Sequence, residues 1–153
     1  MSKSLARVKA ALAAVDAEVY EMAAETRTAQ QAADAVGCAL DQIVKSILFQ
    51  GASGRLFLFL TAGGNQVDAA KASALAGEAL GRADADTVRR VTGFAIGGVA
   101  PVGHLTQPPL WLDRRLTEFA CIYAAAGTPR HLFSIAPAAL LAVSGAEIAD
   151  FTA

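Results

Sequence analysis

The stretch QIVKSILFQGASGRLFLFLT, residues 42–61, decides the fold. Two apolar runs, residues 42–50 and 55–61, flank the loop-forming tetrapeptide Gly51-Ala52-Ser53-Gly54. Short apolar runs bounded by glycines are typical of β-strands, and this connection predicts an antiparallel hairpin. Because both strands are apolar on both faces, we expect other elements to cover the hairpin on both sides.

Helices and strands alternate irregularly around this hairpin. Apolar spacing predicts helices over residues 5–15 (capped by Ser4), 28–36, 67–76, 84–91 and 138–143, and strands over residues 17–22, 110–112, 118–125 and 131–135. Thr28 and Gln31 have the spacing of a capping box at the start of the second helix, and Gly37 is expected to end it. The order lacks a regular strand–helix repeat. We therefore predict an α+β fold, a mixed sheet flanked by helices, in a single domain spanning residues 1–153.

Composition excludes several classes of protein. The chain is 54% hydrophobic and has a net charge of -1, so it is neither disordered nor held on nucleic acid by bulk charge. No apolar run approaches the roughly 20 residues that span a bilayer. The basic group Lys3, Arg7 and Lys9 is interpreted either as a solvated helix face or as a local phosphate contact.

Cysteine and histidine are too few and too scattered for a metal site. The chain has two of each, Cys38, Cys121, His104 and His131, without a Cys-x-x-Cys motif. We therefore expect no metal and no cofactor. Free thiols that pack as small hydrophobes are typical of a reducing compartment, which indicates a cytoplasmic protein.

Lys45 is the most informative single residue, because it is the only charged side chain between Asp41 and Arg55. Strand alternation places it on one face with Ile43 and Ile47. A lysine there either extends to the rim of the sheet or lies at a pocket floor, where its ammonium would bind a phosphate or a developing oxyanion.

Residues 92–104, TGFAIGGVAPVGH, form a second candidate feature. Glycine lets backbone N–H groups approach a ligand closely, and successive N–H groups bind anions or polarise a carbonyl. An ordinary surface loop with tight turns is the alternative. His104 at its end is either a substrate contact or a hydrogen-bonded structural residue.

The lysine strand, followed by Gly97-Gly98-Val99-Ala100-Pro101-Val102-Gly103-His104 and then by Ala126-Gly127, resembles the YbaK/ProRS-associated editing-domain family. The resemblance runs from about residue 17 to residue 141. It implies a largely antiparallel, partly barrel-like sheet with surrounding helices. It also implies a free-standing deacylase that hydrolyses wrongly charged aminoacyl-tRNA, similar to the insertion domain of bacterial prolyl-tRNA synthetases.

The resemblance also implies a site. The essential lysine of the family falls on Lys45, and backbone N–H groups of Gly97 and Gly98 would position the ester carbonyl or the attacking water. Substrate-binding positions fall on Thr28, Val99, Ala100, Pro101, Gly103, His104, Ala125 and Gly127. Hydrolysis would need no metal, because the ribose 2′-hydroxyl of the substrate is thought to assist in this family.

The resemblance implies mischarged tRNA as the substrate. Cys- or Ala-tRNA(Pro) is the preferred assignment, and the Ser or Thr type ranks after it. The partner is then the acceptor end of aminoacyl-tRNA, with an aminoacyl-tRNA synthetase as a possible second partner; the oligomeric state stays open. Two alternatives remain: a non-catalytic binding module associated with a synthetase, and a hydrolase of small aminoacyl esters.

Overall fold

The computed structural model describes residues 2–153, and their strands form one eight-stranded mixed sheet. The order is β1-β7-β6-β2-β3-β5-β8, with β4 beside β2. Most strands pair antiparallel, whereas β2–β6, β3–β5 and β5–β8 are parallel. The bounds are β1 (Ala17–Glu21), β2 (Ile43–Gly51), β3 (Leu56–Ala62), β4 (Leu80–Arg82), β5 (Leu110–Asp113), β6 (Ile122–Ala125), β7 (His131–Ile135) and β8 (Glu147–Ala149).

This arrangement confirms the predicted α+β class and the central hairpin. Strands β2 and β3 pair from Val44 opposite Ala62 to Gln50 opposite Leu56. The edge strands β1 and β8 do not pair with each other in the described chain, so the sheet stays open rather than closing into a barrel.

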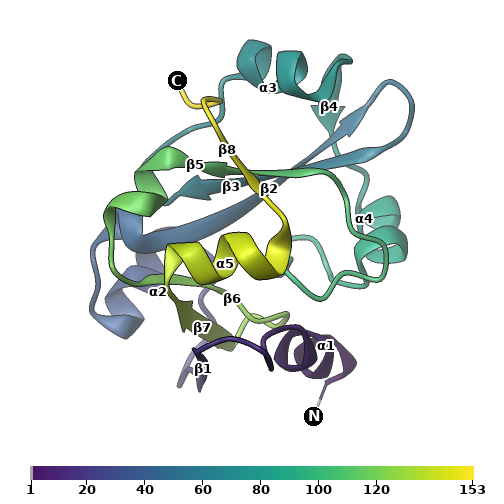
Figure 1. The fold of residues 1–153 in the computed structure, drawn as a ribbon. Coiled ribbons are helices and arrows are strands. Elements are labelled where there is room, and N and C mark those ends of the chain that lie inside the picture. Colours follow the sequence, from purple (N-terminus) through teal and green to yellow (C-terminus); the bar gives the residue numbers. More distant parts are fainter. Residues whose placement is uncertain (1) are drawn as a thin grey trace.

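Five α-helices in residues 2–153 surround the sheet (Figure 1). They are α1 (Lys3–Ala11), α2 (Ala29–Val36), α3 (Ala69–Ala76), α4 (Ala85–Thr92) and α5 (Pro137–Ser144), with 3-10 turns η1 (Leu40–Gln42) and η2 (Arg114–Glu118). Side chains of Ser2, Thr28, Asp68 and Asp84 cap the first four α-helices by accepting a backbone N–H of the first turn. A glycine in the left-handed conformation ends each of the last four.

Both faces of β3 are buried, as the sequence predicts. Leu58 and Leu60 pack into the larger core with α1, α4 and α5. Phe57 and Phe59 point the other way, into a cluster with α3 and Phe151 near the C-terminus. Strand alternation therefore gives the hairpin one aliphatic face and one aromatic face.

The structure corrects several predicted boundaries. The cap of α1 is Ser2 rather than Ser4, and the helix ends at Ala11. The strand expected over residues 118–125 begins at Ile122, because residues 114–118 form η2. Strands β4 and β8 are additions that the sequence reading missed; each has only three residues and no marked alternation.

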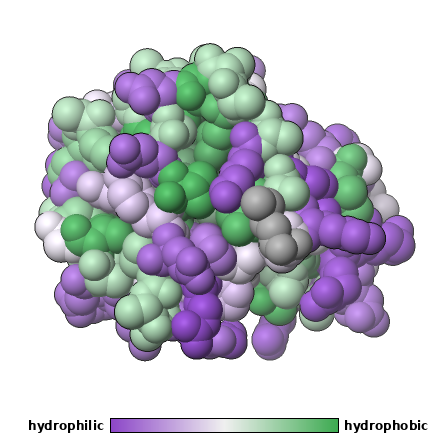
Figure 2. Space-filling model, turned by 90° about the horizontal axis from the view of Figure 1, so that it is seen from below, coloured by the Kyte–Doolittle hydropathy of each residue, from purple (hydrophilic) through white to green (hydrophobic). Residues whose placement is uncertain are grey.

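Figure 2 shows the molecule from below. Polar and apolar residues are intermixed on this face, without one dominant apolar patch. None of the helices in residues 2–153 has the length and apolar character needed to cross a membrane.

The aromatic face supplies a test of packing. Phe59 is fully buried, stacked on Trp111 with ring centroids 5.0 Å apart and in edge contact with Phe49 and Phe151. Phe59→Ala should lower the free energy of unfolding by about 3–5 kcal/mol, measured by urea denaturation. The control Leu75→Ala, on an exposed side chain, should cost less than about 1 kcal/mol. Equal losses in the two variants would contradict this account of the core.

Candidate functional site

One cavity of about 300 Å³ opens beside β2 and brings together segments that are far apart in the sequence. The start of α2, strand β2, the glycine-rich loop and the end of β6 all contribute to its wall. Residues that matter for its chemistry are Thr28, Lys45, Gly97, Val99, Tyr123 and Ala125. The structure thus places the lysine and the loop at a common cavity, as the sequence analysis expected.

Lys45 neither points into bulk solvent nor lies unpaired. Its Nζ donates a hydrogen bond to the carbonyl oxygen of Asn65, 2.5 Å away. Burial lowers the pKa of the ammonium, while the negative charges of Asp113 and Asp41 oppose that shift. An ammonium has three N–H donors. Within residues 2–153 the structure engages one of them with a protein acceptor, which leaves donors for a ligand.

The cavity is electropositive although the protein as a whole has a net charge of -1. Among the described residues that line it, the two charged side chains are Arg27 and Lys45, and both are basic. Arg27 is mostly exposed and pairs with Glu25, 2.6 Å away, which lies outside the cavity wall. Such a wall favours an anionic ligand group.

The glycine loop reaches the cavity through a tight turn. The amide of Gly98 donates to the carbonyl of Ala95, 3.0 Å away, and Gly97 has φ +86°, a conformation that glycine adopts without strain. The Gly98 N–H is therefore committed to the turn. The N–H groups of Gly97 and Val99 have no protein acceptor within residues 2–153, so they are the donors that the loop offers.

Strand β2 adds a stretch of open backbone edge. On the side away from β3, it pairs with β6 only at Ile43 and Val44, and with β4 from Phe49 onward. Between these two pairings, in the described chain, Lys45 to Leu48 have no strand partner on that edge. Residues 45–47 line the cavity. Some of their backbone donors and acceptors are thus available to a ligand, because strand N–H and C=O groups point sideways in alternation.

Thr28 borders the cavity as the cap of α2. Its hydroxyl accepts the amide of Gln31, and the Gln31 side chain accepts the Thr28 amide in return. This capping box, which the sequence predicts, fixes the helix start against the cavity. Ala124 and Ala125, at the end of β6, form another part of the cavity wall, where their small side chains leave space for a ligand.

The other predicted site residues support the loop rather than line the cavity. Ala100 and Pro101 are buried. A side chain on Gly103 would press on the Arg7 backbone, and one on Gly127 would press on Ser4, so both glycines allow α1 to approach. The Nε2 of His104 lies 2.7 Å from the Ala100 carbonyl oxygen. Burial lowers the pKa of His104, so the ring is neutral at pH 7 and donates this bond.

Arg7 is a structural brace of the same loop, not a free basic residue. Its guanidinium donates to the carbonyls of Gly93 (2.7 Å) and Gly103 (3.1 Å), and it lies over the Phe94 ring. It therefore ties together the two ends of the segment that carries Gly97. The basic face proposed from the sequence is reduced to Lys3 and Lys9, which are exposed.

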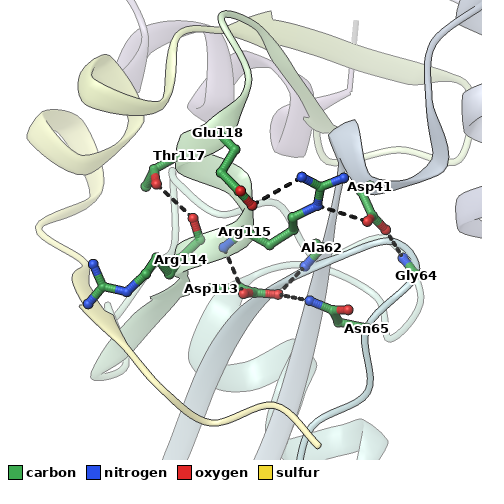
Figure 3. Close-up of polar contacts among 9 residues, drawn as sticks. All are labelled: Asp41, Ala62, Gly64, Asn65, Asp113, Arg114, Arg115, Thr117 and Glu118. Carbon is green, nitrogen blue, oxygen red and sulfur yellow. Dashed lines mark hydrogen bonds and ion pairs between the residues drawn. The ribbon is translucent and has the colours of Figure 1, made fainter.

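Sequence reasoning missed three contributors to the site. Arg27 precedes a helix and carries no motif. Asn65 lies on a turn and Asp113 at a strand end, and Figure 3 shows the contact between them. The Asn65 carbonyl in turn accepts a hydrogen bond from Lys45, so the network joins distant segments. Asp113 also accepts the Arg115 amide at the start of η2.

Residues 23–143 match the family model of the aminoacyl-tRNA editing domain. The chain belongs to this family. A crystal structure described as "a putative trans-editing enzyme for prolyl tRNA synthetase" is 47% identical and superimposes with a TM-score of 0.91, covering 100% of this chain and 99% of that one. The predicted family, and with it an enzyme that edits aminoacyl-tRNA, is confirmed.

Two curated bacterial relatives are more distant. The uncharacterized protein YwhH of Bacillus subtilis (strain 168) is 29% identical over 131 residues, which cover 86% of this chain and 83% of YwhH. EbsC of Enterococcus faecalis (strain ATCC 700802 / V583), described as a "putative Cys-tRNA(Pro)/Cys-tRNA(Cys) deacylase", is 23% identical over 126 residues, 82% of this chain and 77% of EbsC.

The brace on the loop is open to a direct test. Arg7→Ala removes two charged hydrogen bonds to carbonyls and should lower the free energy of unfolding by roughly 1–3 kcal/mol, measured by urea denaturation. Lys9→Ala, on the exposed side of the same helix, should change it by no more than about 0.5 kcal/mol. If the two variants are equally stable, Arg7 does not hold the loop.

Proposed function

We propose that this protein is a trans-editing deacylase that hydrolyses the ester linking a small, wrong amino acid to tRNA(Pro), alanine or cysteine first and serine or threonine next. The observation that carries the proposal is the shared cavity: it is lined by Lys45 and by Gly97 and Val99, whose N–H groups have no protein acceptor within residues 2–153. These groups suit an ester on a polyanion, because they stabilise negative charge without acting as acids or bases.

In the proposed mechanism, Lys45 holds the phosphate or carbonyl side of the terminal adenosine. The amides of Gly97 and Val99 orient the ester carbonyl or the attacking water, which modifies the initial assignment to Gly97 and Gly98 because the Gly98 amide is bonded within its turn. The 2′-hydroxyl of the substrate assists the attack, so the proposal needs neither a side-chain nucleophile nor a metal.

The size of the cavity supports a small amino acid. About 300 Å³ must hold both the aminoacyl group and the ribose, and the walls are already occupied by Ile43, Val44 and Leu132. One methylene changes binding by only about 1–3 kcal/mol, so discrimination against the cognate proline, with its rigid ring, is proposed to be steric. The relative EbsC, described as a "putative Cys-tRNA(Pro)/Cys-tRNA(Cys) deacylase", is in line with a small side chain.

The proposed partner is the acceptor end of aminoacyl-tRNA. The net charge of -1 offers little long-range attraction, so the proposed binding depends on local contacts at the cavity mouth, and a synthetase is the proposed source of further affinity. Because charged tRNA is consumed where translation takes place, the proposed activity would place the protein in the cytoplasm. We propose that residues 1–153 act in this role as one domain.

The central test is a deacylation panel. tRNA(Pro) charged with Ala, Cys, Ser, Thr or Pro is incubated with wild type, and release of the amino acid is followed over time. We expect hydrolysis of the small, wrong amino acids and sparing of Pro-tRNA(Pro). Lys45→Ala should lower kcat/KM by about 10²–10³-fold, the usual cost of losing an oxyanion donor. Lys71→Ala, an exposed lysine on α3, should leave the rate unchanged.

Each other outcome favours a different class. If the protein binds the charged tRNAs but hydrolyses none of them, it is a non-catalytic module associated with a synthetase. Turnover of free aminoacyl esters with no dependence on tRNA indicates a small-ester hydrolase. Equal rates for wild type and Lys45→Ala contradict the proposed role of the ammonium.

A second prediction concerns Arg27 at the cavity mouth. Its pairing with Glu25 is mostly exposed and therefore weak, so the guanidinium is able to exchange the carboxylate for a phosphate of the single-stranded acceptor end. Arg27→Ala should reduce the slope of log kcat/KM against log salt concentration by about 0.7, the value for one single-strand phosphate contact. The control Arg114→Ala, exposed and outside the cavity wall, should keep the wild-type slope. An unchanged slope in Arg27→Ala removes Arg27 from the binding surface.

A further inference from the structure

A buried carboxylate lies behind the Lys45 site and is not part of the cavity wall. Asp113, at the end of β5, is only 4% exposed. One carboxylate oxygen, Oδ2, accepts the Ala62 amide (3.0 Å) and the side-chain amide of Asn65 (2.9 Å), while Oδ1 accepts the Arg115 amide (3.0 Å). Three donors on a buried charge compensate for its lost hydration. The resulting network is fixed on all sides (Figure 3).

Two of these donors belong to the turn that follows β3, residues 62–65. The Asn65 amide closes this turn on the Ala62 carbonyl, 2.9 Å away. Asp41 holds the turn from the opposite side by accepting the Gly64 amide (2.8 Å), and it also pairs with Arg115 (3.0 Å). The turn is thus fixed between two carboxylates, and Asp113 holds both of its ends.

The same turn supplies the acceptor for Lys45. Asn65 offers its side-chain amide to Asp113 and its backbone carbonyl to the Lys45 ammonium. A rotation of this one residue would move both contacts together. We propose that Asp113 is a positioning residue for Lys45: through Asn65 it fixes the carbonyl that holds the ammonium of this cavity-lining residue.

Electrostatics act in the same direction. The charges of Asp113 and Asp41 raise the pKa of Lys45 and so oppose the lowering that burial causes. Other groups nearby are Arg27 and Tyr123, which line the same cavity, and Arg115, which binds Asp41. The positioning inference itself needs only the geometry; its consequence for catalysis rests on the proposed deacylase function.

The test separates geometry from charge with three variants. Asn65→Ala removes the side-chain link but no charge. Asp113→Asn removes the charge and replaces one of the two accepting oxygens by an NH₂ group, which cannot accept the N–H that faced that oxygen. Asp41→Asn removes a charge of the same sign without touching Asn65. Asp150→Asn, on a surface carboxylate paired with Lys71, serves as the remote control and should behave as wild type.

The first readout is NMR of Lys45 in ¹³C,¹⁵N-lysine-labelled protein, with its signals assigned by their loss in Lys45→Arg. We expect Asn65→Ala to narrow the Lys45 Cε signal and to shift it toward that of an exposed lysine, because the ammonium becomes mobile. Asp113→Asn should do the same and should also lower the pH midpoint of the Lys45 titration, since a neighbouring negative charge is lost. Asp41→Asn should lower the midpoint while keeping the broader, wild-type linewidth.

The second readout is the kinetics of deacylation. Misplacement of a reacting group by about 1 Å can cost about 100-fold. We therefore expect kcat to fall by up to about 100-fold in Asn65→Ala, with KM changed far less. Asn65→Ala leaves the buried carboxylate its two backbone donors, so it keeps the test available if Asp113→Asn does not fold.

Wild-type Lys45 signals in both Asn65→Ala and Asp113→Asn would overturn the positioning role, whatever the activity does. Altered Lys45 signals together with a wild-type protein that hydrolyses none of the charged tRNAs would support the positioning role and contradict the proposed function instead. The two ideas therefore fail separately.

Discussion

The hydrogen bond from the Lys45 ammonium to the Asn65 carbonyl is the contact on which the candidate site depends. A lysine on a strand packed on both faces has lost part of its hydration and must recover it from the protein. Here a single carbonyl does so, and that carbonyl belongs to a turn immobilised by two carboxylates. The ammonium of this cavity-lining lysine is consequently held by a fixed acceptor, and it keeps further N–H donors.

The glycine-rich loop at the cavity is likewise held in place by contacts outside the cavity, but through different groups. The Ala95–Gly98 turn makes few contacts of its own, so its position is determined by the segments on either side. Arg7 ties Gly93 to Gly103, and neutral His104 closes the later part of the loop on Ala100. Helix α1, whose basic residues suggested a nucleic-acid contact, therefore contributes a brace, and the close approach is possible because Gly103 and Gly127 lack side chains.

What the sequence predicted correctly is what local chemistry determines. The hairpin follows from two apolar runs around a glycine-bounded turn, and α2 follows from the Thr28–Gln31 capping box and Gly37. Strands β4 and β8 went unrecognised because three residues carry too little periodicity, and both exist only because a neighbouring strand offers an edge. The same reason hid the Asp113 network, since 48 residues separate Asp113 from Asn65 and no spacing rule connects them.

The site itself was predicted in outline because its two key features, a lone lysine in an apolar strand and a glycine-rich loop, are local and resemble a known family. The sequence could not show which backbone amides of the loop are available to a ligand. Of the two neighbouring glycines, only Gly97 keeps a free amide, because the Gly98 amide closes the turn. The geometry of the turn determines which of the two amides is hydrogen-bonded within it, and this geometry depends on the φ angle of Gly97.

The arrangement also explains how a nearly neutral protein is able to act on a polyanion. Both charged side chains among the described residues that line the cavity, Arg27 and Lys45, are basic, while the chain as a whole has a net charge of -1. Long-range attraction to any tRNA is then small, and binding depends on whether the acceptor end and its amino acid fit a small, rigid cavity. A protein that inspects charged tRNA gains from this balance, because weak general affinity releases correctly charged molecules quickly and leaves discrimination to the shape of the site.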